Sequence, residues 1–193
     1  MGMQGMQQDD AGQSLVEFAL VLPVLLMLIL GIAEFAFAYN SRDSVFFAAR
    51  DGSMLAAEGG SIAGTDCVVL DQIERDIVSP AQPVNVQTVK IFWSDRNGVE
   101  LAGTENLYTR GGSTVCLYGN GTSLTVPYTL TTALYPEIDR CDVLAGCGGL
   151  HQAPDNIGVT ISYRHNWVSS VAQISVGGLA FDITAATRIE PQK

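Results

Sequence analysis

One acidic side chain, Glu17, lies where a membrane segment is expected to hold only apolar residues. It is followed by sixteen uncharged residues, 18–33, and preceded by an uncharged stretch that begins at Gly12. An ionised carboxylate at membrane depth costs about 2–3 kcal/mol or more unless it is paired or lies near water. Glu17 is therefore expected either to pair with another group or to lie near water.

Other residue types that do chemistry are present, but their spacing matches no catalytic or phosphate-binding motif. The histidines are His151 and His165, and Ser113 and Ser123 lack the context of a nucleophile elbow. No glycine-rich segment has the Lys and the helix start of a phosphate loop. The many acids are spread over predicted turns and are interpreted as solvated surface. The sequence predicts a protein that is not an enzyme and holds no cofactor or metal.

The four cysteines all follow the apolar run, as expected for a part of the chain that folds in an oxidising compartment. Four cysteines allow three pairings. We favour Cys141 with Cys147, because the five residues between them close a small loop, and this leaves Cys67 with Cys116. Two alternatives stay open. One is four reduced thiols in a cytosolic core, and the other is a zinc site at Cys141, Cys147 and His151, whose spacing lacks a C-x-x-C pair and a fourth ligand.

The apolar run is long enough to form a helix that crosses a membrane. Glu34 alone interrupts it between Phe18 and Tyr39, and these 22 residues would form a helix of about 33 Å, against about 30 Å for the hydrocarbon core of a bilayer. Apolar residues occupy every face, which favours a helix surrounded by lipid or protein over an amphipathic surface helix. Pro23 leaves the carbonyl of Ala19 without its helical partner, so the helix can bend there.

The residues around Glu17 resemble a known processing site. Residues 12–18 read G-x-x-x-x-E-F directly before the apolar run, which is similar to the site cut by prepilin peptidases. The resemblance implies cleavage after Gly12 on the cytoplasmic side of the membrane. Gln13 would become the new N-terminus, and the apolar helix would be retained.

The wider segment 12–39 resembles the N-terminal region of TadE-like proteins, the minor pseudopilins of Tad (Flp) pilus systems. The matching features are Gly12, Glu17, Phe18, Leu22 with Pro23, and a second Gly and Glu at Gly31 and Glu34. The resemblance implies a non-enzymatic subunit of a type IV pilus-like system, which initiates, caps or couples pilus assembly and serves adhesion or secretion.

The resemblance also implies the site residues and the partners. Gly12 and Gln13 would form the processing site, and Glu17, Phe18 and Pro23 would act in assembly. Cleavage would create a cationic α-amine on Gln13, on the same helical face as Glu17, which could pair with its own amine or with that of a neighbouring subunit. The implied partners are a prepilin peptidase, other pilin or pseudopilin subunits contacted through the N-terminal helix, the pilus assembly platform and the membrane.

The expected organisation is a leader over residues 1–12, a transmembrane or assembly helix over 13–39, and an extracytoplasmic α+β domain over 40–193. This describes a single-pass membrane protein whose C-terminal domain lies outside the cytoplasm, in a pilus or at the cell surface. The leader departs from the prepilin pattern, because it contains Asp9 and Asp10 and no base. The expected orientation therefore rests on the resemblance and not on a positive-inside bias.

Two other readings of the N-terminus stay open. Ala36, Phe37 and Ala38 form an A-x-A site, so a secretory signal peptide would release a soluble protein that starts at Tyr39. The absence of a basic n-region and the presence of Glu17 argue against it. The other is an uncleaved signal anchor that holds an extracytoplasmic binding or adhesive domain outside any filament.

Two further helical segments are predicted after Tyr39. The first helix is expected to continue, now amphipathic, with one apolar stripe and an end at Gly59 and Gly60; the stripe is Val45, Phe46, Ala49, Met54 and Ala57. A second helix is predicted over 66–78, with Asp66 as its N-cap. Its apolar stripe is Val69, Ile73 and Ile77.

The rest of the chain has strand signals. Strands are predicted over residues 84–93, 114–118, 124–130, 157–164 and 181–185, with turns at 97–98, 111–112 and 119–121. The fold expected is α+β, with a long N-terminal hydrophobic helix whose amphipathic half packs on an antiparallel sheet in a pilin-like arrangement. The net charge is −10, and the few basic residues are scattered along the chain. They form no basic stripe that could bind a phosphate backbone, so nucleic acid is not expected as a partner.

Overall fold

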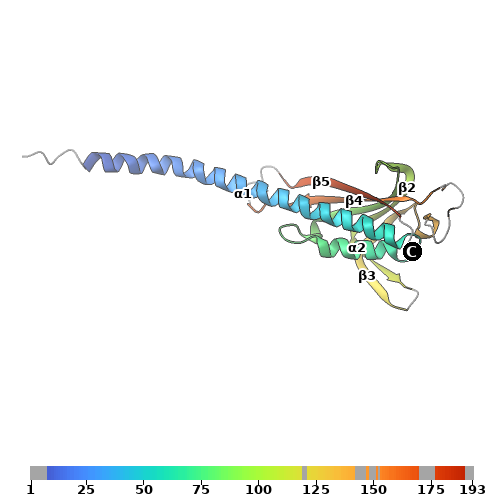
Figure 1. The fold of residues 1–193 in the computed structure, drawn as a ribbon. Coiled ribbons are helices and arrows are strands. Elements are labelled where there is room, and N and C mark those ends of the chain that lie inside the picture. The colour runs from blue at the N-terminus through green and yellow to red at the C-terminus, as the bar shows by residue number, and fades with distance from the viewer. Residues whose placement is uncertain are drawn as a thin grey trace, which may run out of the picture. The chain divides into compact units, whose positions relative to one another are not determined.

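The structure is a computed structural model that describes residues 8–118, 121–141, 147, 151, 153–169 and 177–189. The chain divides into two compact units, Met1–Phe37 and Ala38–Lys193. Helix α1 (Gln8–Gly59) supplies the described part of the first unit and also the first element of the second (Figure 1). A second helix and a five-stranded antiparallel sheet follow, which confirms the predicted α+β class.

The second unit combines its two helices with one sheet. Its further elements are α2 (Thr65–Asp76), η1 (Pro83–Asn85), β1 (Val86–Ser94), β2 (Glu100–Leu117), β3 (Ser123–Ala133), η2 (Glu137–Asp139), β4 (Asn156–His165) and β5 (Leu179–Arg188). The strand order is β3-β2-β1-β4-β5, and each neighbouring pair is antiparallel. Figure 1 shows α2 beside the C-terminal part of α1, with both helices in front of the sheet.

The first unit is helical in its described part. None of the most apolar stretch of α1 is buried within the protein. By length and composition, α1 is the one helix among the described residues that can cross a membrane. Pro23 lies inside this helix, which continues through it.

Small residues form the inward face of α1 in the second unit. The buried positions are Ala38, Ser41, Val45, Ala48, Ala49, Gly52, Ser53, Ala56 and Ala57. A Cβ on Gly52 would lie 3.4 Å from side-chain atoms of Val69 and Ile73 of α2. The side chains of Val69 and Ile73 thus fill the space beside Gly52, and little room remains there for a large side chain from α1.

This close approach corrects the predicted apolar stripe of α1. Val45, Ala49 and Ala57 are buried as predicted, but Phe46 and Met54 are 44% and 43% exposed. The helix turns its large side chains outward because the contact with α2 accepts only small ones. It ends at Gly59, where the sequence predicted its end.

Helix α2 starts and ends slightly earlier than predicted, and its start is built differently. The predicted stripe is buried: Val69, Ile73 and Ile77. The prediction of Asp66 as N-cap is wrong, because the N-cap is Gly64, in the left-handed region with φ 91°, and no side chain of its own caps the helix. Asp66 lies in the first turn and is buried.

The sheet contains every predicted strand, but β2 is much longer than expected. The turn at 97–98 is present, with the Gly98 N–H donating to the carbonyl of Asp95 at 3.1 Å. The turn predicted at 111–112 is wrong, because both glycines lie inside β2, where its register with β3 shifts. A Cβ on Gly112 would lie 1.6 Å from Oγ1 of Thr129, so this glycine permits a close strand contact and not a chain reversal.

The third predicted turn, 119–121, falls partly outside the described residues. At its described end, the Gly121 N–H donates to the carbonyl of Tyr118 at 3.0 Å, and Gly121 has a positive φ of 80°. The described residues Tyr118 and Gly121 are thus joined by a backbone hydrogen bond between positions three residues apart.

One aromatic side chain is buried on the face of the sheet that the helices do not cover. Ile91 is fully buried in the main core, and Phe92 points to the opposite face by strand alternation, yet it is only 2% exposed. Its partner across the ladder is Gly158 of β4. A Cβ on Gly158 would lie 2.2 Å from Cζ of Phe92, so the ring occupies the space that this glycine leaves.

The substitution Gly158→Ala is expected to lower the free energy of unfolding by about 1–3 kcal/mol, because the added methyl group displaces the Phe92 ring. Urea titration of the full-length protein in detergent measures this change. Gly31→Ala is the matched control, because a Cβ at that helical position meets no atom within 4 Å. If Gly158→Ala has the same unfolding free energy as wild type, the close contact between Gly158 and the Phe92 ring is contradicted.

Candidate assembly helix and buried polar network

The predicted processing and assembly residues all lie on α1 in the first unit. Gln13 and Glu17 share a helical face, and Nε2 of Gln13 donates to Oε1 of Glu17 at 3.2 Å. Both side chains are exposed. A Cβ on Gly12 would meet no atom within 4 Å, so the protein itself leaves this segment open.

Phe18 and Pro23 belong to an apolar surface that surrounds this part of the helix. Phe18 is 63% exposed, and the neighbouring leucines and valines are exposed to a similar degree. An apolar surface of this extent marks contact with lipid or with apolar protein. The helix offers apolar contact and the acceptor oxygens of Glu17.

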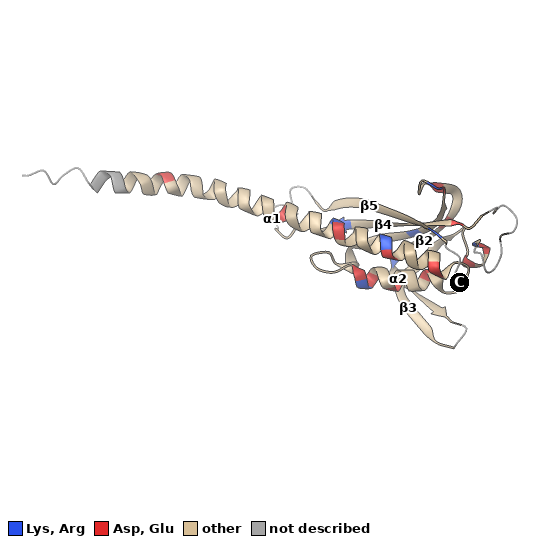
Figure 2. Ribbon diagram, viewed as in Figure 1, with Lys and Arg blue, Asp and Glu red and all other residues tan. Residues whose placement is uncertain are grey.

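No basic side chain lies near Glu17 in the sequence. Residues 1–39 contain acids and neither Lys nor Arg, and the first bases are Arg42 and Arg50. Figure 2 shows the same distribution along α1, with acidic positions and no basic one in its N-terminal part. No Lys or Arg of this stretch can therefore pair with Glu17.

The model of the family described as TadE-like protein matches residues 12–53. This segment is TadE-like. The match starts at Gly12, includes Gln13, Glu17, Phe18 and Pro23, and confirms the predicted resemblance. TadE-like proteins are Tad pilus-related and are not known as enzymes. No curated protein and no solved structure is significantly similar to the chain.

Both favoured disulfides are present in the unit that follows the TadE-like helix. Cys67 of α2 is bonded to Cys116 of β2, and Cys141 is bonded to Cys147. The thiols of the zinc alternative are therefore consumed. Among the described residues, no three His, Cys, Asp or Glu side chains meet in a way that could hold a metal ion.

A buried ion pair that the sequence did not reveal lies at the start of α2. Nη2 of Arg140 donates to Oδ1 of Asp66 at 2.6 Å, and the two side chains are 0% and 3% exposed. Oδ2 of Asp66 accepts from Nδ2 of Asn106 at 2.9 Å and from the hydroxyl of Tyr108 at 2.8 Å. Both oxygens of the buried carboxylate are thus satisfied, as a buried charge requires.

Glu137 caps α2 from a distant part of the chain. Its Oε2 accepts from the N–H of Gly64 at 2.6 Å, and its Oε1 accepts from the N–H of Asp66 at 2.7 Å. This carboxylate therefore takes the place of the N-cap that the sequence assigned to Asp66. Burial, reinforced by the nearby charge of Asp66, raises the pKa of Glu137, while the two backbone hydrogen bonds oppose the rise.

Asp155 joins the second disulfide to the sheet. Its Oδ2 accepts from the hydroxyl of Tyr135 at 2.6 Å and from the N–H of Cys141 at 3.0 Å, and its Oδ1 lies 2.6 Å from Nδ1 of His151. The imidazole of His151 in turn stacks on the indole of Trp93, with ring centroids 4.2 Å apart. Burial raises the pKa of the Tyr135 phenol above its ordinary value, and the bond to Asp155 adds to that rise.

These contacts correct the interpretation of the acids as solvated surface. Asp66 and Asp155 are 2% and 1% exposed, and each is held by donors from several elements. Sequence reasoning missed them because Asp66 and its cation Arg140 are 74 residues apart. No local spacing connects them, and an acid in a predicted turn or helix start looks the same whether it is buried or exposed.

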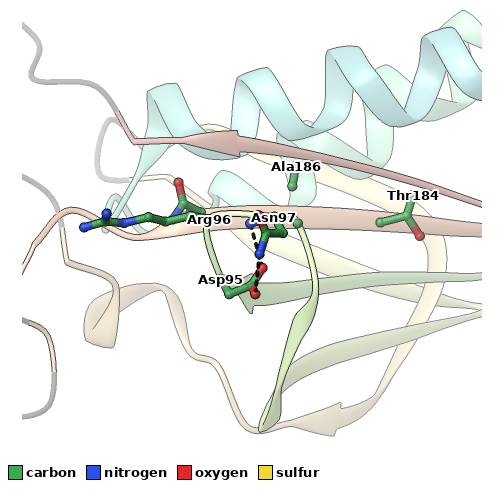
Figure 3. A pocket seen from close by; sticks show the side chains of 7 residues that line it. Asp95, Arg96, Asn97, Thr184 and Ala186 are labelled. Carbon is green, nitrogen blue, oxygen red and sulfur yellow. Dashed lines mark hydrogen bonds between the residues drawn. The ribbon is translucent and has the colours of Figure 1, made fainter.

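A surface hollow of about 430 Å³ lies at the turn between β1 and β2 (Figure 3). Its lining is Asp95, Arg96, Asn97, Gly98, Asn156, Thr184 and Ala186. The carboxylate of Asp95 accepts from the N–H groups of Val99 at 2.9 Å and of Asn97 at 2.8 Å, and these bonds, the one from Val99 most of all, lower the pKa of Asp95. Asp95 therefore shapes the turn, and it is not arranged as a proton-transfer group.

The substitution Arg140→Met is expected to cost about 3–5 kcal/mol of unfolding free energy, because it leaves the Asp66 carboxylate buried without its cation. Urea titration of the full-length protein with intact disulfides measures the loss. Arg75→Met is the control, because Arg75 is 68% exposed and its pair with Asp71 is expected to contribute less than about 1 kcal/mol. The double variant Asp66→Asn, Arg140→Met should recover part of the loss, and equal effects of Arg140→Met and Arg75→Met would contradict this role.

The raised pKa of Glu137 predicts a pH-dependent contribution to stability. The folded protein binds this proton more tightly than the unfolded chain, for which the ordinary pKa is 4.5. The contribution is therefore complete below the ordinary pKa and is lost as pH rises through the folded pKa. Unfolding free energies of wild type and Glu137→Gln, measured from about pH 7 to about pH 4.5, should show wild type gaining relative to the variant as pH falls. A difference in unfolding free energy between wild type and Glu137→Gln that does not change with pH would contradict the prediction.

Proposed function

We propose that this protein is a non-enzymatic minor pseudopilin that a prepilin peptidase cuts between Gly12 and Gln13, and that it takes part in assembly of a Tad (Flp) pilus. The observation that carries the proposal is the TadE-like match, which begins at Gly12 and continues along an exposed apolar helix. Glu17 stands in this helix at the position where a new α-amine on Gln13 would be one turn away.

The surroundings of Gly12 support its role as the processing site. No atom of the described protein lies near enough to a Cβ at this position to cover it. A peptidase embedded in the membrane could therefore reach the bond after Gly12 without unfolding any packed element. The helix that remains after cleavage keeps all of its apolar side chains.

Membrane retention and subunit contact follow from the same surface. Before assembly the apolar helix would hold the protein in the bilayer, and in a pilus it would pack against helices of other pilin or pseudopilin subunits. The exposed Phe46, Phe47 and Met54 extend the apolar surface of α1 into the second unit. They offer further contacts to neighbouring subunits or to the assembly platform in initiation, capping or coupling.

The two disulfides support a location outside the cytoplasm for the second unit. Disulfides form and persist in oxidising compartments, whereas the cytosol keeps thiols reduced. We infer a single-pass protein whose C-terminal domain lies outside the cytoplasm and reaches the cell surface when it enters a pilus.

Processing is tested by the mass of the mature N-terminus. The full-length protein is produced together with a prepilin peptidase, and wild type is expected to begin at Gln13, while Gly12→Ala accumulates the longer form because the peptidase requires the glycine. Ala36→Val, in the A-x-A site, is the control and should be processed like wild type. A chain that begins at Tyr39 would show a signal peptide, and an intact Met1 would favour a signal-anchored binding or adhesive domain.

A further inference from the structure

The cleavage under the proposed function, on which this inference rests, would make a glutamine, Gln13, the N-terminal residue. An N-terminal glutamine can close on itself: the α-nitrogen attacks Cδ of its own side chain, and a five-membered lactam forms. The N–Cδ bond replaces the Cδ–Nε2 bond, a proton passes from the α-nitrogen to the departing nitrogen, and ammonia leaves. The reaction needs no oxidant and no second reactant.

Closure of this ring would remove the charge on which the helix depends. The α-amine of Gln13 is a cation, whereas the lactam nitrogen is a neutral amide. Residues 1–39 supply no Lys or Arg, so Glu17 would be left as an uncompensated acid in an apolar stretch. A chain that keeps its amine and a chain that has lost it would therefore differ in how their helices can pair.

The structure shows the Gln13 side chain in a conformation that opposes ring closure. Its amide donates through Nε2 to Oε1 of Glu17 at 3.2 Å, so the amide is directed toward the next turn of the helix. Closure requires Cδ, which belongs to this same amide, to fold back onto the α-nitrogen of Gln13. The two arrangements exclude each other.

Glu17 can also restrain the other reactant. The Gln13 amide donates to Oε1, and an α-ammonium on the same helical face could bind the same carboxylate through Oε2. An ammonium held against a carboxylate has no lone pair with which to attack. One carboxylate can thus hold the amide away and keep the amine protonated.

The apolar surroundings make this double contact more persistent than it would be in water. Leu15, Val16 and Phe18 flank the pair and expose 71%, 57% and 63% of their surface to whatever surrounds the helix. In lipid or in an apolar bundle, little water competes for the amide and the carboxylate, and a group without a partner costs free energy. We propose that the mature N-terminal Gln13 is a site of lactam formation, and that Glu17 is the positioning residue that slows closure of the lactam ring.

The test compares processed chains that differ at Glu17. Wild type, Glu17→Val and Glu17→Gln are each produced in full length with a prepilin peptidase, purified in detergent and incubated at neutral pH. Mass spectrometry follows the loss of one ammonia from the N-terminal peptide, and an amine-reactive label follows the free α-amine. Glu17→Val is expected to lose ammonia and labelling several-fold faster than wild type, and Glu17→Gln, which keeps an acceptor oxygen without the charge, should fall between them.

Two controls separate the inference from general effects of mutation. Gln13→Asn combined with Glu17→Val should keep its amine, because the shorter side chain would have to close a four-membered ring. Leu20→Val, on the same helix, should react at the wild-type rate. Equal rates of ammonia loss in wild type and Glu17→Val, both starting at Gln13, would overturn this inference and leave the proposed processing intact, whereas chains that still start at Met1 would overturn both.

Discussion

The structure depends on one helix that meets two different surroundings. Before Ala38, α1 exposes apolar side chains on all sides, and such a surface needs lipid or apolar protein around it. In the second unit, the same helix turns small residues toward α2 and keeps Phe46 and Phe47 outside. A helix can do both because its backbone hydrogen bonds are internal, so only its side chains have to match the environment.

The second unit holds its charged groups in a way that ties distant parts of the chain together. Arg140 and Asp66 form an ion pair at the start of α2, and Glu137, which follows β3 in the chain, caps that helix. Asp155 connects Tyr135 to the backbone of Cys141. These bonds act at the same end of the domain as the disulfides, so covalent and polar links brace one region together.

The proposed role of Glu17 follows from the absence of Lys and Arg in residues 1–39. A carboxylate at Glu17 has no cation in its own segment, and the proposed cleavage would create one a single turn away. The bond already present between Gln13 and Glu17 shows that this spacing brings the two side chains together. The family model described as TadE-like protein matches residues 12–53, and this match includes Gln13, Glu17 and the apolar part of α1 that follows them.

The sequence by itself determined whatever is encoded locally. The apolar run predicted α1, alternation predicted the strands, a six-residue separation favoured the bond between Cys141 and Cys147, and the motif at Gly12 indicated the family. The tertiary structure alone decided which acids are buried, that Glu137 and not Asp66 caps α2, and that Gly112 serves a strand contact and not a turn. The physical reason is distance along the chain: periodicity acts between neighbours, whereas the partner of a buried charge such as Asp66 lies 74 residues away and is chosen only when the chain folds.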